Sequence, residues 1–208
     1  MQTSEDICRL APVIPVLIVE DVAAAKPLAE ALVTGGLPAL EVTLRTPAAL
    51  EVIRAMADVE GGIVGAGTLL TPGDVKAARA AGAKFGVSPG ATDTLLKAAE
   101  DEGLPLLPGA GTPSEVMALL ERGVEMMKFF PAEPSGGAAF LKALASPLPN
   151  AKFCPTGGIS MKNAANYLSA PNILCVGGSW VAPTDAIDDG DWSRIEGLAR
   201  DAVQVLAP

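Results

Sequence analysis

Residues 37–60, "LPALEVTLRTPAALEVIRAMADVE", hold one strand followed by one helix, and they decide the fold. Over 40–45 apolar and polar residues alternate, as in a strand with two different faces. Over 47–60 the apolar residues recur with helical spacing, after a Thr-Pro pair that is typical of a helix start. This stretch therefore predicts one βα unit.

The same unit repeats along the chain. Short apolar runs end in Gly, Pro or polar residues, and Ala/Leu-rich helical segments follow them. The runs are 13–20, 37–45, 62–70, 84–90, 104–111, 124–131, 151–158 and 172–180. Eight units predict an α/β fold, a single (β/α)8 TIM barrel over residues 1–208, with a short helix over 2–10 before the first strand. A doubly wound open sheet is the alternative, but no G-x-G-x-x-G motif opens the first helix.

Composition excludes several classes of protein. Half of the 208 residues are apolar, yet no apolar run approaches the roughly 18 residues of a membrane helix. The N-terminus has no signal-peptide pattern. The net charge of −9 argues against nucleic acid as a partner. Cys8, Cys154 and Cys175 are odd in number and widely spaced, which predicts a cytoplasmic protein with neither a disulfide framework nor a zinc site. Cys154 and Cys175 lie inside apolar runs and are predicted to be core residues.

The chain contains no histidine. Histidine-based triads, histidine-ligated metals and histidine proton shuttles are therefore excluded. Any acid–base chemistry must fall to Glu, Asp, Lys, Tyr, Cys or water.

Polar residues occupy the inner face of the second strand, near the end where barrel enzymes carry their active sites. Because side chains alternate along a strand, Leu40 and Val42 face the helices, and Glu41, Thr43 and Arg45 face inward. A structural ion pair or a solvated edge is the alternative interpretation. A Glu and an Arg at this position favour a functional site.

Lys128 lies in the apolar run "VEMMKFFP" (124–131), on the face that also carries Met126 and Phe130. A lysine there loses hydration, which disfavours the ammonium form. A neutral amine attacks carbonyl carbon and forms a Schiff base. The alternative is a structural ion pair with an acid, Glu41 or Glu133. The run by itself does not decide between the two.

Two glycine-rich segments follow the seventh and eighth runs: "CPTGGIS" (154–160) and "LCVGGSW" (174–180). In many barrels these two loops bind phosphate through backbone N–H groups. Thr156 and Ser179 add hydroxyl donors. The segments "GAGTL" (65–69), "SPG" (88–90) and "PGAGTP" (108–113) end three further runs with small residues. They either line a pocket that positions Thr68 or form plain turns.

The motifs "LEVTLRT", "IVGAGTLL", "VSPG", "MKFFPAE", "FCPTGGIS" and "VGGSW" together resemble the bacterial 2-keto-3-deoxy-6-phosphogluconate (KDPG) and 4-hydroxy-2-oxoglutarate (KHG) aldolase family. The resemblance runs from about Pro12 to the last helix. One departure concerns the first strand, where relatives often carry an Arg and this chain has "PVLIVED" (15–21). That difference leaves the specificity at the sugar end open.

The resemblance implies a homotrimer of (β/α)8 barrels and a class I aldolase that uses no metal and no cofactor. Lys128 matches the Schiff-base lysine, and Glu41 matches the acid–base carboxylate. The matching substrate-binding positions are Arg45, Thr68, Pro89, Phe130, Thr156, Gly157, Gly158, Gly178 and Ser179. The implied partners are small molecules, a keto-acid sugar phosphate and pyruvate.

The reaction implied by the resemblance is cleavage of 2-dehydro-3-deoxy-6-phosphogluconate to pyruvate and glyceraldehyde 3-phosphate, a step of the Entner–Doudoroff pathway. The same site would split 4-hydroxy-2-oxoglutarate to pyruvate and glyoxylate. Three alternatives remain: an aldolase for the galactonate epimer, a phosphate-binding lyase or decarboxylase that needs Mg²⁺, and a non-catalytic barrel that binds a sugar phosphate.

Overall fold

The structure is a computed structural model, and it describes residues 2–206. The domain expected over 1–208 thus includes Met1, Ala207 and Pro208, which lie outside the described residues. The stretch 37–60 forms the expected unit: β2 (Ala39–Thr43) is followed by α3 (Ala49–Met56).

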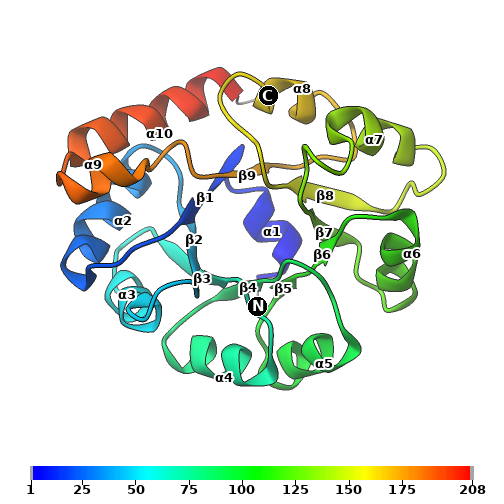
Figure 1. Cartoon of the computed structure of the whole chain (residues 1–208), viewed down its shortest axis with the longest axis horizontal. Helices are drawn as coiled ribbons and strands as arrows, with labels where there is room; N and C mark the ends of the chain where they lie inside the picture. The colour runs from blue at the N-terminus through cyan, green and yellow to red at the C-terminus, as the bar shows by residue number, and fades with distance from the viewer. Residues whose placement is uncertain (1, 207–208) are drawn as a thin grey trace.

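Parallel strands form the wall of a (β/α)8 barrel (Figure 1). They are β1 (Val13–Leu17), β2, β3 (Ile63–Gly67), β4 (Phe85–Val87), β5 (Leu106–Leu107), β6 (Gly109–Ala110), β7 (Met126–Phe129), β8 (Lys152–Pro155) and β9 (Val176–Gly178). One sheet has the order β5-β4-β3-β2-β1-β9, and a second has the order β6-β7-β8. The parallel bridges Phe153–Ile173 and Thr156–Gly177 join β8 to the segment of β9. The two sheets therefore form one continuous wall.

The fifth run, 104–111, differs from the expected single strand because it is divided into β5 and β6. Pro108 lies between them, and a proline has no N–H to give to a strand ladder. The next strand segment begins at Gly109, where a Cβ would lie 2.2 Å from the Pro89 carbonyl oxygen. A glycine lets the two backbones approach this closely.

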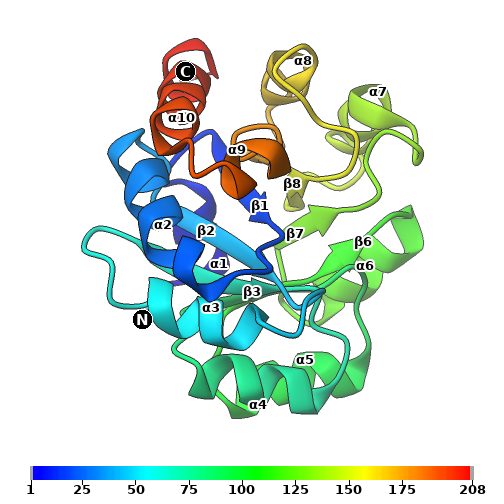
Figure 2. The same cartoon turned by 60° about the vertical axis from the view of Figure 1, so that its left-hand side comes forward.

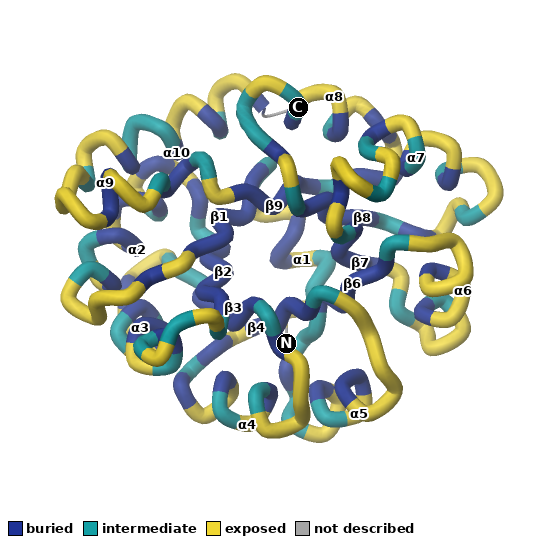
Figure 3. The backbone as a smooth tube through the Cα atoms, in the orientation of Figure 1, coloured by how far each residue is buried: buried dark blue, intermediate teal, exposed yellow. Residues whose placement is uncertain are grey.

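Helices surround the strands on the outside (Figures 1 and 2). They are η1 (Val22–Ala24), α2 (Ala25–Thr34), α3, α4 (Pro72–Ala80), α5 (Asp93–Asp101), α6 (Pro113–Glu121), α7 (Gly137–Leu144), α8 (Ala164–Leu168), α9 (Thr184–Asp188) and α10 (Trp192–Leu206). Figure 3 shows that their inward sides are buried and their outward sides exposed. The Thr-Pro pairs at 71–72 and 112–113 begin α4 and α6, with the threonine in a capping box.

Side-chain alternation along the strands separates two hydrophobic cores. Leu40, Val42, Met127 and Phe129 belong to the larger core, between strands and helices. Met126 belongs to the smaller core, inside the barrel. The predicted outward facing of Leu40 and Val42 is confirmed, and Lys128, which lies between Met127 and Phe129 in sequence, faces inward.

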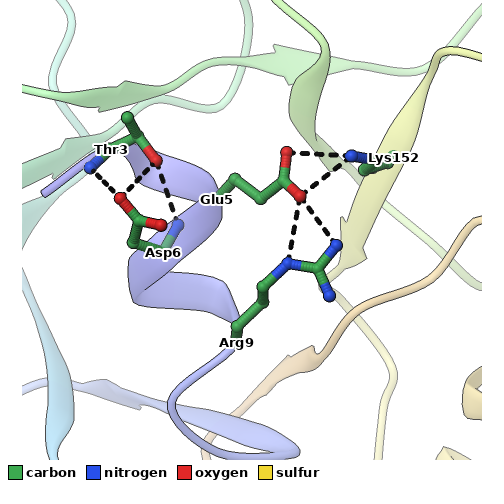
Figure 4. Close-up of polar contacts among 5 residues, drawn as sticks. All are labelled: Thr3, Glu5, Asp6, Arg9 and Lys152. Atoms are coloured by element: carbon green, nitrogen blue, oxygen red, sulfur yellow. Dashed lines mark hydrogen bonds and ion pairs between the residues drawn. The ribbon is translucent and has the colours of Figure 1, made fainter.

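Helix α1 (Ser4–Cys8) lies at the centre of the ring of strands in Figure 1 and is shorter than the expected 2–10. Ile7 and Cys8 are buried in the core inside the barrel. Glu5 accepts a hydrogen bond of 2.8 Å from Lys152 at the start of β8, and it also pairs with Arg9 (Figure 4). The helix thereby closes the N-terminal end of the barrel and leaves the opposite end for a site.

Candidate active site

Lys128 of β7 and Glu41 of β2 meet inside the barrel. Lys128 Nζ lies 3.4 Å from Glu41 Oε1, and the two side chains are only 5% and 3% exposed. The other acid considered as a partner, Glu133, instead accepts a hydrogen bond from Tyr167. Lysine and glutamate are almost never buried this completely unless they are paired. Residues 87 positions apart in sequence thus form one buried amine–carboxylate pair.

Burial raises the pKa of Glu41 above its ordinary value, and the nearby positive charge of Lys128 opposes part of that rise. A carboxylate with a raised pKa takes up a proton more readily than one in water. Glu41 is therefore placed to accept and return protons beside the amine.

Gly67, at the end of β3, makes room for the Glu41 side chain. A Cβ at this position would lie 2.3 Å from Glu41 Oε1 and 2.7 Å from its Cγ. Any larger residue would displace the carboxylate from Lys128. The sequence motif "GAGTL" contains this glycine, but spacing alone gives no reason to connect it with Glu41.

Arg45 and Thr68 lie together just beyond the ends of β2 and β3. Arg45 Nε donates to Thr68 Oγ1 over 3.3 Å. Thr68 has φ of +62°, the left-handed region that residues other than glycine rarely adopt. Such strained backbone clusters at functional sites. Thr43, which was expected to face inward, is buried and donates to the Leu17 carbonyl, so it ties β2 to β1.

A cavity of about 250 Å³ opens at the C-terminal end of the barrel. Seven of the predicted binding residues line it: Arg45, Phe130, Thr156, Gly157, Gly158, Gly178 and Ser179. The further lining residues, which the sequence did not indicate, are Val16, Ile18, Ile159 and Gly177.

The amine and the remaining predicted residues lie at or beyond the border of this cavity. Lys128 Nζ is 5.1 Å from the centre of the Phe130 ring, which lines the cavity. Thr68 does not itself line the cavity, but it accepts a hydrogen bond from Arg45, which does. Pro89 is half-buried and does not line the cavity; its carbonyl oxygen faces Gly109.

The glycine segments have backbone conformations suited to binding an anion. Gly157 and Gly158 have φ of +104° and +80°. Their N–H groups donate to no acceptor among residues 2–206, so they are available to a ligand. At Gly178 a Cβ would lie 1.8 Å from the Trp180 ring. Glycine is therefore needed at this position because any side chain would clash with the tryptophan.

Asn163 braces the first glycine segment, a role the sequence did not indicate. Its Nδ2 donates to the Gly158 carbonyl over 3.0 Å, and its Oδ1 accepts from the Ser160 N–H over 2.8 Å. These two hydrogen bonds fix the turn without use of the Gly157 and Gly158 N–H groups.

Cys8, Cys154 and Cys175 are free, buried and gathered in the core inside the barrel. The neighbouring Cys154 thiol, together with burial, raises the pKa of Cys8 and Cys175 well above the ordinary thiol value. Both thiols therefore keep their protons and pack as apolar groups.

Within residues 2–206, no group of three or more His, Cys, Asp and Glu side chains could hold a metal ion.

No helix in the described part of the chain is both long enough and apolar enough to cross a membrane.

Comparison with protein families gives a match over residues 4–198 to the model described as KDPG and KHG aldolase. A 2-dehydro-3-deoxy-phosphogluconate aldolase of Pseudoalteromonas atlantica is 50% identical over 202 residues, which are 97% of this chain and 94% of the relative. The family match and the relative both span nearly the whole barrel.

Two solved structures are similar in both fold and sequence. The 2-keto-3-deoxy-6-phosphogluconate aldolase of Zymomonas mobilis ZM4 with 3-phosphoglycerate has a TM-score of 0.91 and 51% identity, over 96% of this chain and 94% of that one. The KDPG aldolase of Legionella pneumophila, with pyruvate captured as a covalent carbinolamine, also has a TM-score of 0.91, with 44% identity over 95% of this chain and 97% of that one.

Proposed function

Because the chain belongs to the KDPG and KHG aldolase family, we propose that it cleaves 2-dehydro-3-deoxy-6-phosphogluconate to pyruvate and glyceraldehyde 3-phosphate through a Schiff base on Lys128. The observation that carries the proposal is the buried Lys128–Glu41 pair beside a cavity lined by glycine loops. The pyruvate-bound relative and the 3-phosphoglycerate-bound relative support the two ends of the substrate.

The first steps use Lys128. Glu41, 3.4 Å away, takes the proton that the ammonium must lose, and the neutral amine attacks the C2 ketone of the substrate. Glu41 then gives this proton to the carbinolamine hydroxyl, which leaves as water, and a protonated imine remains. The imine accepts the electron pair of the C3–C4 bond when that bond breaks.

Glu41 carries the later protons. Because its proton left with the water of the carbinolamine, Glu41 is ionised again and removes the proton of the C4 hydroxyl, directly or through a water. The C3–C4 bond breaks, glyceraldehyde 3-phosphate leaves, and an enamine of pyruvate remains on Lys128. Glu41 then returns the proton to C3, and water hydrolyses the imine. Glu41 thus carries out several proton transfers, a role for which this chain has no histidine.

The binding residues divide between the two ends of the substrate. Arg45, positioned by Thr68, holds the substrate carboxylate, since a guanidinium matches its planar geometry. The Gly157 and Gly158 N–H groups and the Ser179 hydroxyl hold the phosphate. The 4-hydroxy-2-oxoglutarate reaction needs only the carboxylate end and the lysine. We propose that neither a metal nor an organic cofactor takes part and that the enzyme is a homotrimer.

Release of pyruvate from defined substrates tests this function. We expect turnover of the phosphogluconate substrate, undiminished in excess EDTA, together with turnover of 4-hydroxy-2-oxoglutarate. Faster turnover of the galactonate epimer would identify the epimer's aldolase instead. Loss of activity in EDTA with recovery in Mg²⁺ would indicate a metal-dependent lyase. Binding without turnover of any of the three compounds would indicate a non-catalytic sugar-phosphate barrel.

Gly158→Asp is expected to raise KM for the phosphorylated substrate strongly, with a smaller effect on imine formation with pyruvate. The added carboxylate would repel the phosphate. A Cβ at Gly158 also strains the backbone at φ +80° and lies 2.6 Å from Glu133 Cγ. Gly158→Ala shares that strain without the charge and is the matched control. Equal KM values for the two variants would place the phosphate elsewhere.

A further inference from the structure

The loops that follow β7 and β8 are hydrogen-bonded side by side. The Ala132 N–H donates to the Thr156 carbonyl over 2.8 Å, and the Glu133 N–H donates to the Gly157 carbonyl over 3.1 Å. The backbone of Glu133 is therefore fixed against the segment whose free N–H groups form the candidate phosphate site.

The Glu133 side chain covers one face of Gly158 and then reaches away from it. A Cβ on Gly158 would lie 2.6 Å from Glu133 Cγ and 2.8 Å from its Cβ. Beyond that stem, Glu133 Oε1 accepts a hydrogen bond from the Tyr167 hydroxyl of α8. A Cβ on Gly137 would lie 3.3 Å from this hydroxyl and 3.4 Å from the carboxylate oxygen. The carboxylate thus lies between Tyr167 and Gly137, at the start of α7.

The charge of Glu133 is unfavourable for an anion site. Glu133 is exposed, and a carboxylate that turned toward the Gly157 and Gly158 N–H groups would compete with a phosphate and repel it. Tyr167 is only 1% exposed, so its position is fixed by packing. Burial and the neighbouring carboxylate raise the pKa of Tyr167, so its hydroxyl keeps its proton and stays a donor. Hydrogen bonds to an ionised acceptor are among the stronger ones in proteins.

We propose that Tyr167 is a positioning residue that holds the Glu133 carboxylate away from the Gly157–Gly158 segment and so makes this barrel selective for phosphorylated over unphosphorylated keto acids. The inference rests on the proposed function and deepens it. Neither side chain lines the cavity. The pair acts through the charge beside the phosphate and leaves the cleavage chemistry unchanged.

Tyr167→Phe keeps the ring and removes the donor. We expect kcat/KM for the phosphorylated substrate to fall roughly tenfold, mainly through KM, because the freed carboxylate repels the phosphate across a partly hydrated gap. Activity on 4-hydroxy-2-oxoglutarate, which has no phosphate, should not change. The loss should shrink at high ionic strength, because salt screens the repulsion.

Glu133→Gln provides the matched control, since its amide oxygen still accepts from Tyr167 and it has no charge. We expect wild-type selectivity for this single variant. Combining Glu133→Gln with Tyr167→Phe should restore most of the lost kcat/KM, because the freed side chain is neutral. An equal loss on both substrates, or no recovery in the double variant, would show that Tyr167 is only structural and would overturn the inference.

Titration calorimetry with inorganic phosphate repeats the comparison without catalysis. Weaker binding to Tyr167→Phe with recovery in the double variant supports the inference, and equal affinity in all variants contradicts it. Failure of the proposed function is a separate result, the absence of pyruvate release from every substrate by the wild-type protein.

Discussion

Lys128→Arg is expected to reduce cleavage of 2-dehydro-3-deoxy-6-phosphogluconate by roughly four orders of magnitude or more, the scale on which loss of a covalent nucleophile acts. A guanidinium keeps the positive charge beside Glu41 but does not lose its proton in proteins. It therefore cannot form the imine. Pyruvate release in a coupled assay measures the loss.

The same substitution separates chemistry from stability. Because the introduced guanidinium would keep an ion pair with Glu41, the folded state should persist, and the thermal midpoint should change far less than the activity. Removing the charge altogether would leave a buried carboxylate unpaired, which costs about 3–5 kcal/mol in comparable sites. Substantial turnover by a folded Lys128→Arg protein would mean that Lys128 is only an ion-pair partner.

Glu41→Gln should reduce both C–C cleavage and proton exchange at the pyruvate methyl group by about 100-fold or more, the usual contribution of general acid–base catalysis. The amide keeps the shape of the side chain but cannot take up a proton. Exchange is followed by loss of the methyl proton signal of pyruvate in deuterated water. Imine formation with pyruvate should survive, so trapping by borohydride serves as the control in the same samples.

The pH dependence of exchange gives a second measure of Glu41. As the base, Glu41 must be ionised, and burial raises its pKa. The wild-type exchange rate should therefore fall as the pH drops, with a midpoint above the ordinary range of glutamate. Glu41→Gln should lack this acid limb. A variant that exchanges at the wild-type rate would assign the proton transfers to another group or to water.

The fold and the family were predictable because they depend on local pattern. The repeated strand–helix units indicated the barrel, which the solved relatives confirm, and the ordered motifs indicated the aldolase family. The inward facing of Lys128 and Glu41 followed from alternation along two strands. Each of these inferences needs only neighbours in sequence.

Other features depend on segments that meet only in the folded chain. The dependence of Glu41 on Gly67 arises because β2 and β3 pair with a particular register. Cys8 joins Cys154 and Cys175 because α1 closes the barrel, and spacing in sequence made them look unrelated. The left-handed Thr68 could not be predicted, since threonine disfavours that conformation. The division of the fifth strand at Pro108, in contrast, could have been predicted from the sequence. A proline inside a strand run argues against a continuous strand.

The central claim is that Lys128 forms the Schiff base, and borohydride trapping tests it most directly. The protein incubated with pyruvate and sodium borohydride should lose activity irreversibly, with the three-carbon acid fixed on one lysine as a secondary amine. Modified lysine resists trypsin, so the label should lie in an uncleaved peptide from Gly123 to Lys142 that contains Lys128. Label on another lysine, or full activity after treatment, would contradict the mechanism.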